Sequence, residues 1–147
     1  ILSGLVGSEM CIRDSVKTVL NPAPANKPSD ILLQNTSWFI PNEIEFEEIY
    51  GDIFNENNLL LFAKNVDTNV VVTLGEKGCA YIENNSVKII KADSVKAIDT
   101  TGAGDAFVGA FSFALASKLD IEECLKLALK KATDSVTKKG TQSSYKN

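Results

Sequence analysis

The order of apolar and polar positions along the chain predicts β-strands that alternate with helices. Two short apolar runs, residues 16–20 and residues 38–40, are each followed by prolines, which cannot continue a sheet ladder. The run NVVVTLG, residues 69–75, is continuous, largely β-branched and closed by a glycine. Such a run is typical of a strand buried on both faces, and it indicates a parallel central sheet.

Helical spacing follows the second of these runs. Asn42, with Glu45 three positions later, can cap a helix. The apolar positions expected on that helix are Ile44, Phe46, Ile49, Tyr50 and Ile53. A further short helix is expected over residues 59–65.

Two longer helices are predicted near the end of the chain. Residues 106–117 are apolar on almost every face, which predicts a buried helix. Asp120 can cap a last helix over residues 121–135. Its core positions are Leu125, Ala128, Leu129 and Ala132.

A hairpin is predicted between the central strand and these helices. Residues 79–82 and 87–90 read as its strands, and Asn84 with Asn85 forms the turn. Strands that alternate with helices define an α/β protein. We therefore predict a three-layer α/β/α sandwich with a mostly parallel central sheet.

The composition of the chain excludes several classes of ligand and of catalytic mechanism. The chain of 147 residues is 44% hydrophobic and 23% charged, which fits one domain, and its net charge of -4 disfavours binding to nucleic acid. It has no histidine, which excludes Ser-His-Asp and Cys-His catalysis and His-ligated metals. Cys11, Cys79 and Cys124 form no CxxC pair and are interpreted as buried thiols in a reducing compartment. No apolar run approaches the ~20 residues of a membrane span, so we expect a cytoplasmic protein with a small-molecule substrate.

The first fifteen residues, ILSGLVGSEMCIRDS, show neither a helical nor a strand period. The string GLVGSEMCIRDS resembles a translated sequencing-adapter read. We therefore expect residues 1–15 to be an artefactual segment and residues 16–147 to form the domain.

The stretch DTTGAGDAF, residues 99–107, places two carboxylates around a glycine-rich turn that leads into a helix. Backbone N–H groups in such a turn, together with the helix N-terminus, can bind a phosphate. A carboxylate there can accept a proton from an attacking hydroxyl. The stretch lacks the spacing of a dinucleotide fingerprint and of a Walker loop. By itself it is equally compatible with a tight turn before a capped helix.

A wider set of motifs adds to this stretch. VKAIDTTGAGDAFVGAFSFALA resembles the signature of the ribokinase family of pfkB-type carbohydrate kinases. NPAPA, PNEIE, TLGEKG and KKGTQSSY follow the order and approximate spacing of the C-terminal half of that family. The resemblance covers residues 16–147, and the last motif is similar to eukaryotic forms.

The resemblance implies ATP-dependent transfer of the γ-phosphate to a sugar hydroxyl. Asp105 would be the general base, and the amides of Gly102, Ala103, Gly104 and Asp105 would form the anion hole. Asn42 and Glu45 would help to organise Mg²⁺ and phosphate, and their alternative interpretation as a helix cap pair is compatible with that role. Residues at the nucleotide phosphates would be Thr73, Leu74, Gly75, Glu76, Lys77 and Gly78, which also read as a strand-ending turn.

A potassium site beside the anion hole is also implied by the resemblance. Its ligands, mostly backbone carbonyls, would be Asp99, Thr101, Ser135, Lys138, Gly140 and Ser144. Residues 137–144 also read as a polar surface turn. Leu129 aligns with a family position near the adenine that often carries Asn or His, so a hydrogen bond to the base would be lost there.

The resemblance implies that the sugar-binding residues and a β-sheet lid, which forms a homodimer contact, lie outside this chain. We therefore expect a chain that is almost inactive alone. The GTQSSY motif favours the ribose 5-hydroxyl as acceptor. Fructose or a nucleoside such as adenosine remains open, and so does a non-catalytic, truncated nucleotide-binding protein.

Overall fold

A computed structural model of the chain describes residues 16–137 and Gly140. It contains one sheet of five strands whose order in space follows their order in the chain. The strands are β1 (Val19–Leu20), β2 (Trp38–Phe39), β3 (Asn69–Thr73), β4 (Cys79–Glu83) and β5 (Ser86–Ile90). β1, β2 and β3 run parallel, whereas β4 and β5 are each antiparallel to the preceding strand. The sheet is therefore mixed, with a parallel half and an antiparallel half.

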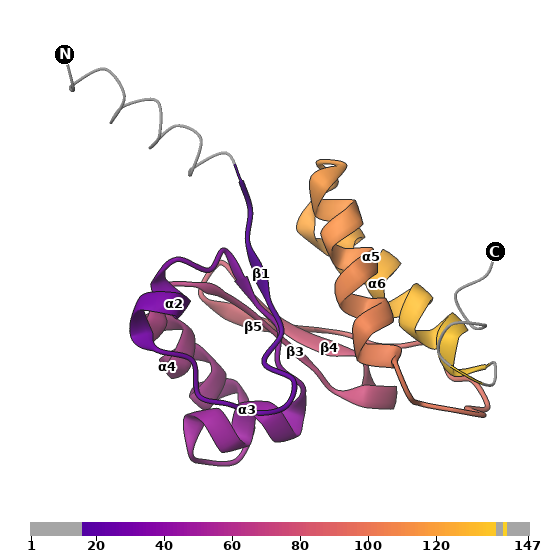
Figure 1. Ribbon diagram of the computed structural model, residues 1–147, viewed down its shortest axis with the longest axis horizontal. Coiled ribbons are helices and arrows are strands. Elements are labelled where there is room, and N and C mark those ends of the chain that lie inside the picture. The colour runs from indigo at the N-terminus through magenta and orange to yellow at the C-terminus, as the bar shows by residue number, and fades with distance from the viewer. Residues whose placement is uncertain (1–15, 138–139, 141–147) are drawn as a thin grey trace.

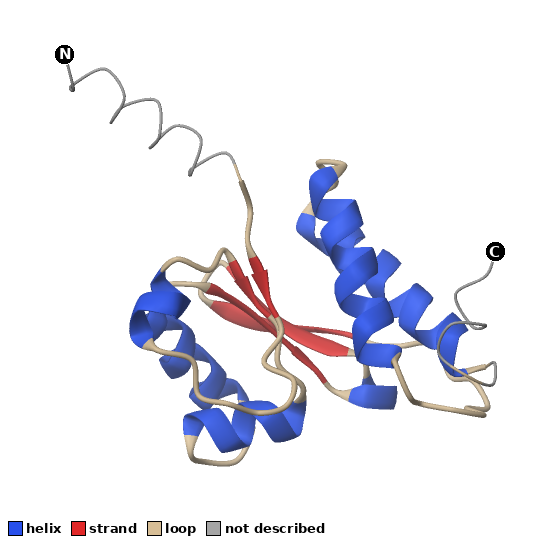
Figure 2. Ribbon diagram, viewed as in Figure 1, coloured by secondary structure: helices blue, strands red, loops and turns tan. Residues whose placement is uncertain are grey.

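Helices cover both faces of this sheet (Figure 1). α2 (Asp30–Gln34), α3 (Glu43–Tyr50) and α4 (Glu56–Val66) lie on one side, and α5 (Ala103–Ala116) and α6 (Ile121–Val136) lie on the other. Figure 2 shows the strands between the two groups of helices. The predicted three-layer α/β/α sandwich is confirmed.

Alternation along the strands divides the core into two clusters. Val71 and Trp38 face α5 and α6, where the Trp38 ring meets Phe111 edge to face at 5.2 Å between centroids. Val70 and Val72 face the opposite way and pack with aromatic rings of α3 and α4. β3 contributes side chains to both clusters, so it is buried on both faces, as its composition predicted.

The hairpin and the helix caps follow the sequence closely. Asn84 and Asn85 both adopt positive φ angles in the turn between β4 and β5, a conformation that asparagine tolerates. Asn42 and Asp120 cap α3 and α6 as predicted. Glu83 and Lys88 form an ion pair across the hairpin.

Some local features differ from the predictions. α2 was not predicted, and β1 is shorter than the expected residues 16–20. α3 ends at Tyr50 because Gly51 adopts a left-handed conformation, so Ile53 lies outside the helix, and it is exposed. Ile44 is also exposed rather than buried.

α5 is not buried all round in the described part of the chain. Phe107 and Phe111 belong to the core, but the side of the helix that carries Phe113 leaves that ring 68% exposed. The helix also begins three residues earlier than predicted, at Ala103 rather than Ala106. This earlier start brings the glycine-rich turn into the first turn of the helix.

Cys79 on β4 and Cys124 on α6 are buried free thiols in the core cluster between the sheet and the α5–α6 pair, as predicted. Burial raises the pKa of the Cys79 thiol to about 12, because the thiolate would lose its hydration. Burial also raises the pKa of Cys124. Neither thiol is therefore a reactive nucleophile at neutral pH. Cys11 lies outside the described residues.

Candidate functional site

A pocket of about 160 Å³ lies where the three parallel strands end. β1, β2 and β3 present their carboxyl ends at the same edge of the sheet, which is where ligands bind in open α/β sheets. The start of α5 forms the opposite wall. The pocket is lined by Asn21, Ala23, Ile40, Asn42, Glu45, Thr73, Gly102, Gly104, Asp105 and Val108. Four segments that are distant in sequence therefore meet in one place.

The α3 side of the pocket is held by a reciprocal cap. The Asn42 side-chain oxygen accepts the N–H of Glu45 at 2.8 Å, and the Glu45 carboxylate accepts the N–H of Asn42 at 2.8 Å. Glu45 is buried although it carries a carboxylate. The cap interpretation and the binding interpretation of this pair are thus compatible, since the capped pair also lines the pocket.

The α5 side of the pocket is formed by a helix start without a side-chain cap. Gly102 precedes the helix with φ 81°, a conformation that favours glycine. The Ala103 N–H donates to Thr100 at 3.3 Å, whereas among the described residues the N–H groups of Gly104 and Asp105 have no acceptor. These two donors and the helix dipole can therefore stabilise an anion in the pocket.

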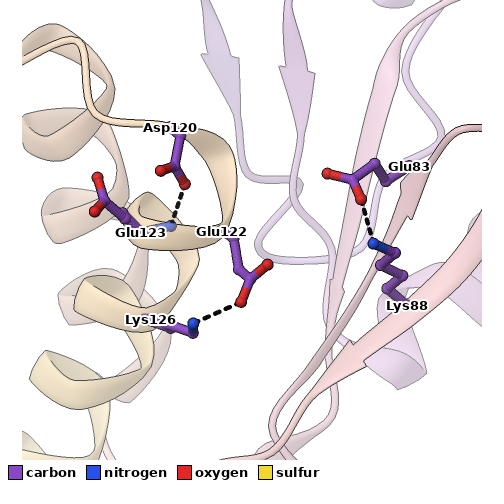
Figure 3. Close-up of polar contacts among 6 residues, drawn as sticks. All are labelled: Glu83, Lys88, Asp120, Glu122, Glu123 and Lys126. Atoms are coloured by element: carbon purple, nitrogen blue, oxygen red, sulfur yellow. Dashed lines mark hydrogen bonds and ion pairs between the residues drawn. The ribbon is translucent and has the colours of Figure 1, made fainter.

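Each of the other α-helices in the described part of the chain has one of its first-turn N–H groups satisfied by a capping side chain. Ser29, Asn42, Asn55 and Asp120 cap α2, α3, α4 and α6 respectively. At α6 the Asp120 carboxylate accepts the N–H of Glu123 at 2.8 Å, and Glu122 pairs with Lys126 one turn later (Figure 3). α5 differs from these helices at the point where it lines the pocket.

Asp105 is exposed and stands in the first turn of α5 at the pocket wall. A carboxylate at this position is favoured by the positive end of the helix dipole. It can accept a proton from a hydroxyl that enters the pocket. The anion donors and this acceptor thus come from consecutive residues of one turn.

The TLGEKG segment is only partly at the pocket. Thr73 lines it, and its N–H donates to the Pro41 carbonyl at 3.0 Å, which extends the β2–β3 pairing. Gly75 to Lys77 form a single 3₁₀ turn, and Lys77 lies 3.6 Å from Glu43 at the start of α3. The segment is therefore attached to the helix that carries the capped pair.

Gly78 has a structural reason to be glycine. Its φ is 108°, and an added Cβ would lie 1.9 Å from the Ile90 carbonyl oxygen. Gly75 has φ 58° but open space around it. Leu74 and Leu129 are buried in the two core clusters, and neither lines the pocket.

The residues expected at the potassium site are brought together in part. The two oxygens of Asp99 accept the N–H groups of Thr101 at 2.9 Å and Gly140 at 3.2 Å. The Ser135 hydroxyl is buried and donates to Ala132, while Lys138 and Ser144 lie outside the described residues. The Asp99 carboxylate thus connects the entry to α5 with the segment that follows α6.

Sequence reasoning missed four lining residues: Asn21, Ala23, Ile40 and Val108. Asn21 and Ala23 belong to the NPAPA motif, which was recognised only as a strand-ending segment with a family resemblance. The available signal was their position directly after a parallel strand, because such positions converge with the ends of neighbouring strands.

Two classes of feature are absent from the part of the chain that the structure describes. It holds no group of three or more His, Cys, Asp or Glu side chains that could ligate a metal ion. Its helices are too short or too polar to cross a membrane.

Comparison with known proteins defines the class to which this fold and pocket belong. The pfkB family of carbohydrate kinases matches residues 7–147, and the chain belongs to that family. A ribokinase of Haemophilus influenzae is 40% identical over 150 residues, covering 97% of this chain and 49% of that protein. A deoxyribokinase of Salmonella typhi is 37% identical over 139 residues, covering 90% and 45%. The chain spans about half the length of the curated relatives it matches.

Solved structures agree with this assignment. Ribokinase from Thermotoga maritima superposes with a TM-score of 0.80 at 34% identity, covering 92% of this chain and 48% of that one. Arabidopsis thaliana ribokinase complexed with ribose and ATP gives 0.77 at 27% identity, covering 88% and 44%. A Vibrio cholerae fructokinase bound to fructose, ADP and a potassium ion gives 0.70 at 30% identity, covering 78% and 38%.

Proposed function

We propose that this chain is the phosphate-handling part of an ATP-dependent sugar kinase that transfers the γ-phosphate of ATP to the 5-hydroxyl of ribose. One observation carries the proposal: the unsatisfied donors of Gly104 and Asp105 share a pocket with the Asn42–Glu45 pair and Thr73. A phosphoryl group needs donors for its oxygens and a base for the attacking hydroxyl, and this pocket offers both.

In this proposal Asp105 accepts the proton of the sugar hydroxyl as that oxygen attacks the γ-phosphorus. The backbone around Gly102 to Asp105 stabilises the negative charge that develops on the transferring group. The bond that breaks joins the γ-phosphorus to the bridging oxygen of ADP. The products are ADP and the sugar phosphate, and the proton is left on Asp105.

Asn42 and Glu45 are the residues proposed to organise Mg²⁺. Their fit rests on the donor set, because a buried carboxylate and an amide oxygen beside a phosphate site suit a hard cation that keeps several waters. When bound, Mg²⁺ would neutralise charge on the phosphates. Asp99 is proposed as a potassium ligand with Thr101, Ser135, Lys138, Gly140 and Ser144, supported by the contacts from Asp99 to Thr101 and Gly140.

The TLGEKG segment is proposed to lie along the nucleotide phosphates, with Leu129 near the base. The Lys77–Glu43 contact supports the first part, since it holds the segment beside the capped pair. Leu129 is buried in the middle of α6, so contact with a base would require the structure around this residue to move. The cytoplasm and a homodimeric whole protein stay predictions, which fractionation and light scattering can check.

The test is sugar-dependent conversion of ATP to ADP, followed by ³¹P NMR, in the protein expressed from the complete gene. Ribose, 2-deoxyribose, fructose and adenosine are offered separately, because the relatives include a ribokinase, a deoxyribokinase and a fructokinase, and a nucleoside was left open by the sequence. We expect ribose 5-phosphate as the main product. A preference for another acceptor would reject ribose but retain the kinase, and conversion that is indifferent to Asp105→Asn would reject the proposed base.

A further inference from the structure

Asn21 lines the pocket, directly after β1, and has no assigned role. Its side-chain Nδ2 donates to the carbonyl oxygen of Ile40 at 2.7 Å. Ile40 follows β2 and is fully buried, and it leads through Pro41 to Asn42. Asn21 therefore contacts the segment that delivers the Asn42–Glu45 pair to the pocket.

The strand pairing explains why a side chain is needed there. In the parallel ladder between β1 and β2, the N–H of Trp38 donates to Thr18 and the N–H of Ile40 donates to Leu20 at 2.8 Å. In a parallel ladder, hydrogen bonds are given by the two strands in turn. The next bond would therefore be donated by the N–H of residue 22 to the Ile40 carbonyl. Residue 22 is proline and has no N–H. The Asn21 amide supplies the missing donor.

The turn after β2 is consequently held from both sides. The Ile40 carbonyl accepts from Asn21, and the next carbonyl, that of Pro41, accepts the N–H of Thr73 from β3. Asn42 comes next, and its own N–H donates to Glu45. The Ile40 and Pro41 carbonyls and the Asn42 N–H are all hydrogen-bonded, so the orientation of the capped pair depends on the two contacts that precede it.

We propose that Asn21 is a positioning residue of the site: its carboxamide replaces the ladder donor that Pro22 lacks, and thereby fixes the Ile40–Asn42 turn and the Asn42–Glu45 pair at the pocket. The inference rests on the proposed function for its consequence, which is Mg²⁺-dependent binding of nucleotide. Its geometric part is independent of any ligand.

The ligand-independent test is amide hydrogen exchange, followed by NMR on the chain. Asn21→Ala removes the donor, and we expect the N–H of Asn42 to exchange about tenfold faster, because its bond to Glu45 is no longer held in place. The matched control is Asn69→Ala. Asn69 donates from Nδ2 to the Ser37 carbonyl at 2.9 Å, a bond of the same kind at the opposite end of β2. Equal exchange of Asn42 in the two variants would overturn the proposal.

A rescue variant tests the reason for the contact. Pro22→Ala restores a backbone N–H at the ladder position, so the double variant Asn21→Ala/Pro22→Ala should return Asn42 exchange to near that of the wild type. Pro22→Ala alone should leave it unchanged, because Asn21 still donates. If the Asn42 N–H exchanges as fast in the double variant as in Asn21→Ala, the idea that Asn21 replaces a ladder donor is overturned.

The consequence for binding is measured with a non-hydrolysable ATP analogue, with and without Mg²⁺. Asn21→Ala should weaken binding about tenfold in Mg²⁺, the usual effect of losing an outer positioning contact, and leave binding without Mg²⁺ unchanged. Equal losses in both conditions would assign Asn21 a general structural role and overturn its positioning role. If the wild-type chain binds no nucleotide, the proposed function fails, while the exchange results still decide whether Asn21 holds the turn.

Discussion

α5 and α6 are neighbours in the chain and pack against each other, yet they begin in opposite ways. α6 starts after Asp120, whose carboxylate accepts the N–H of Glu123 and so caps the helix with a side chain of the protein. α5 starts after Gly102, without a side-chain cap, at the wall of the pocket. In α6 a side chain satisfies one first-turn donor, the Glu123 N–H, whereas in α5 the N–H groups of Gly104 and Asp105 have no acceptor among the described residues. A helix start without a cap is therefore informative when a pocket lies in front of it.

Exchanging one carboxylate for an amide at each helix start should give the largest contrast. Asp105→Asn keeps the shape of the side chain but removes the proton acceptor, so we expect sugar-dependent ADP formation to fall by about 10³-fold, with the fold retained. Asp120→Asn is the matched control, because asparagine caps helices as well as aspartate does. Activity is measured in the protein from the complete gene. Similar losses in both variants would contradict the difference between the two helix starts.

A methyl group added to α5 should produce the next largest effect. A Cβ at Gly104 would meet nothing within 4 Å, so Gly104→Ala should fold normally and hinder only the close approach of an anion. We expect binding of an ATP analogue to weaken by about 10²-fold, because the methyl group would hold the phosphate away from the N–H groups of this turn, and access to one such donor is worth about that factor in catalysis. Fluorescence titration of the chain measures this.

Gly109→Ala is the control for that variant. It lies on the same helix, also in open space, but not in the pocket lining. Both substitutions should leave the chain as stable or make it slightly more stable, since alanine favours helix more than glycine by up to about 1 kcal/mol. Unchanged nucleotide affinity in Gly104→Ala would show that no ligand approaches the start of α5.

The two glycines of the TLGEKG segment differ in why a side chain is unfavourable: at Gly78 it would clash with a neighbour, whereas at Gly75 only the backbone conformation opposes it. Gly78→Ala would force a Cβ into the Ile90 carbonyl at a positive φ, and we expect a loss of at least about 2 kcal/mol in unfolding free energy. Gly75→Ala meets no neighbour and should lose only about 1 kcal/mol from its φ of 58°. Urea denaturation measures both, and equal losses would contradict the steric explanation for Gly78.

Removing the cap of α6 should give the smallest effect. Asp120→Ala deletes the acceptor for the Glu123 N–H, and we expect a loss of about 1 kcal/mol in unfolding free energy with nucleotide binding unchanged. Thermal unfolding with and without ATP analogue measures the two quantities. A loss of nucleotide affinity would mean that α6 also contributes its helix start to binding.

The features that could be predicted from the sequence are those set by a few adjacent residues. The caps at Asn42 and Asp120, the Asn84–Asn85 turn and the doubly buried β3 each depend on local chemistry, and the structure has all of them. The resemblance to the family added the expectation that motifs distant in the sequence take part in one site. Asn42, Glu45, Thr73 and Asp105 do line one pocket, although their roles stay proposals.

The features that escaped prediction depend on contacts between distant segments. Asn21 acquires its contact only through the register of β1 against β2, which no single segment encodes. α2 has five residues and buries only Leu33, so its periodic signal is too short to recognise. The exposed ring of Phe113 was missed because composition cannot tell which side of an apolar helix meets the sheet.

The two core clusters have a consequence for the energetics of the molecule. The capped pair stands on α3, which packs in one cluster, and Gly104 with Asp105 stands on α5, which packs in the other. A phosphate bound between them would contact both helical layers, which pack on opposite faces of the sheet. Since a ligand stabilises only the states that bind it, occupancy should suppress independent opening of either layer, and the protein would unfold as a single cooperative unit.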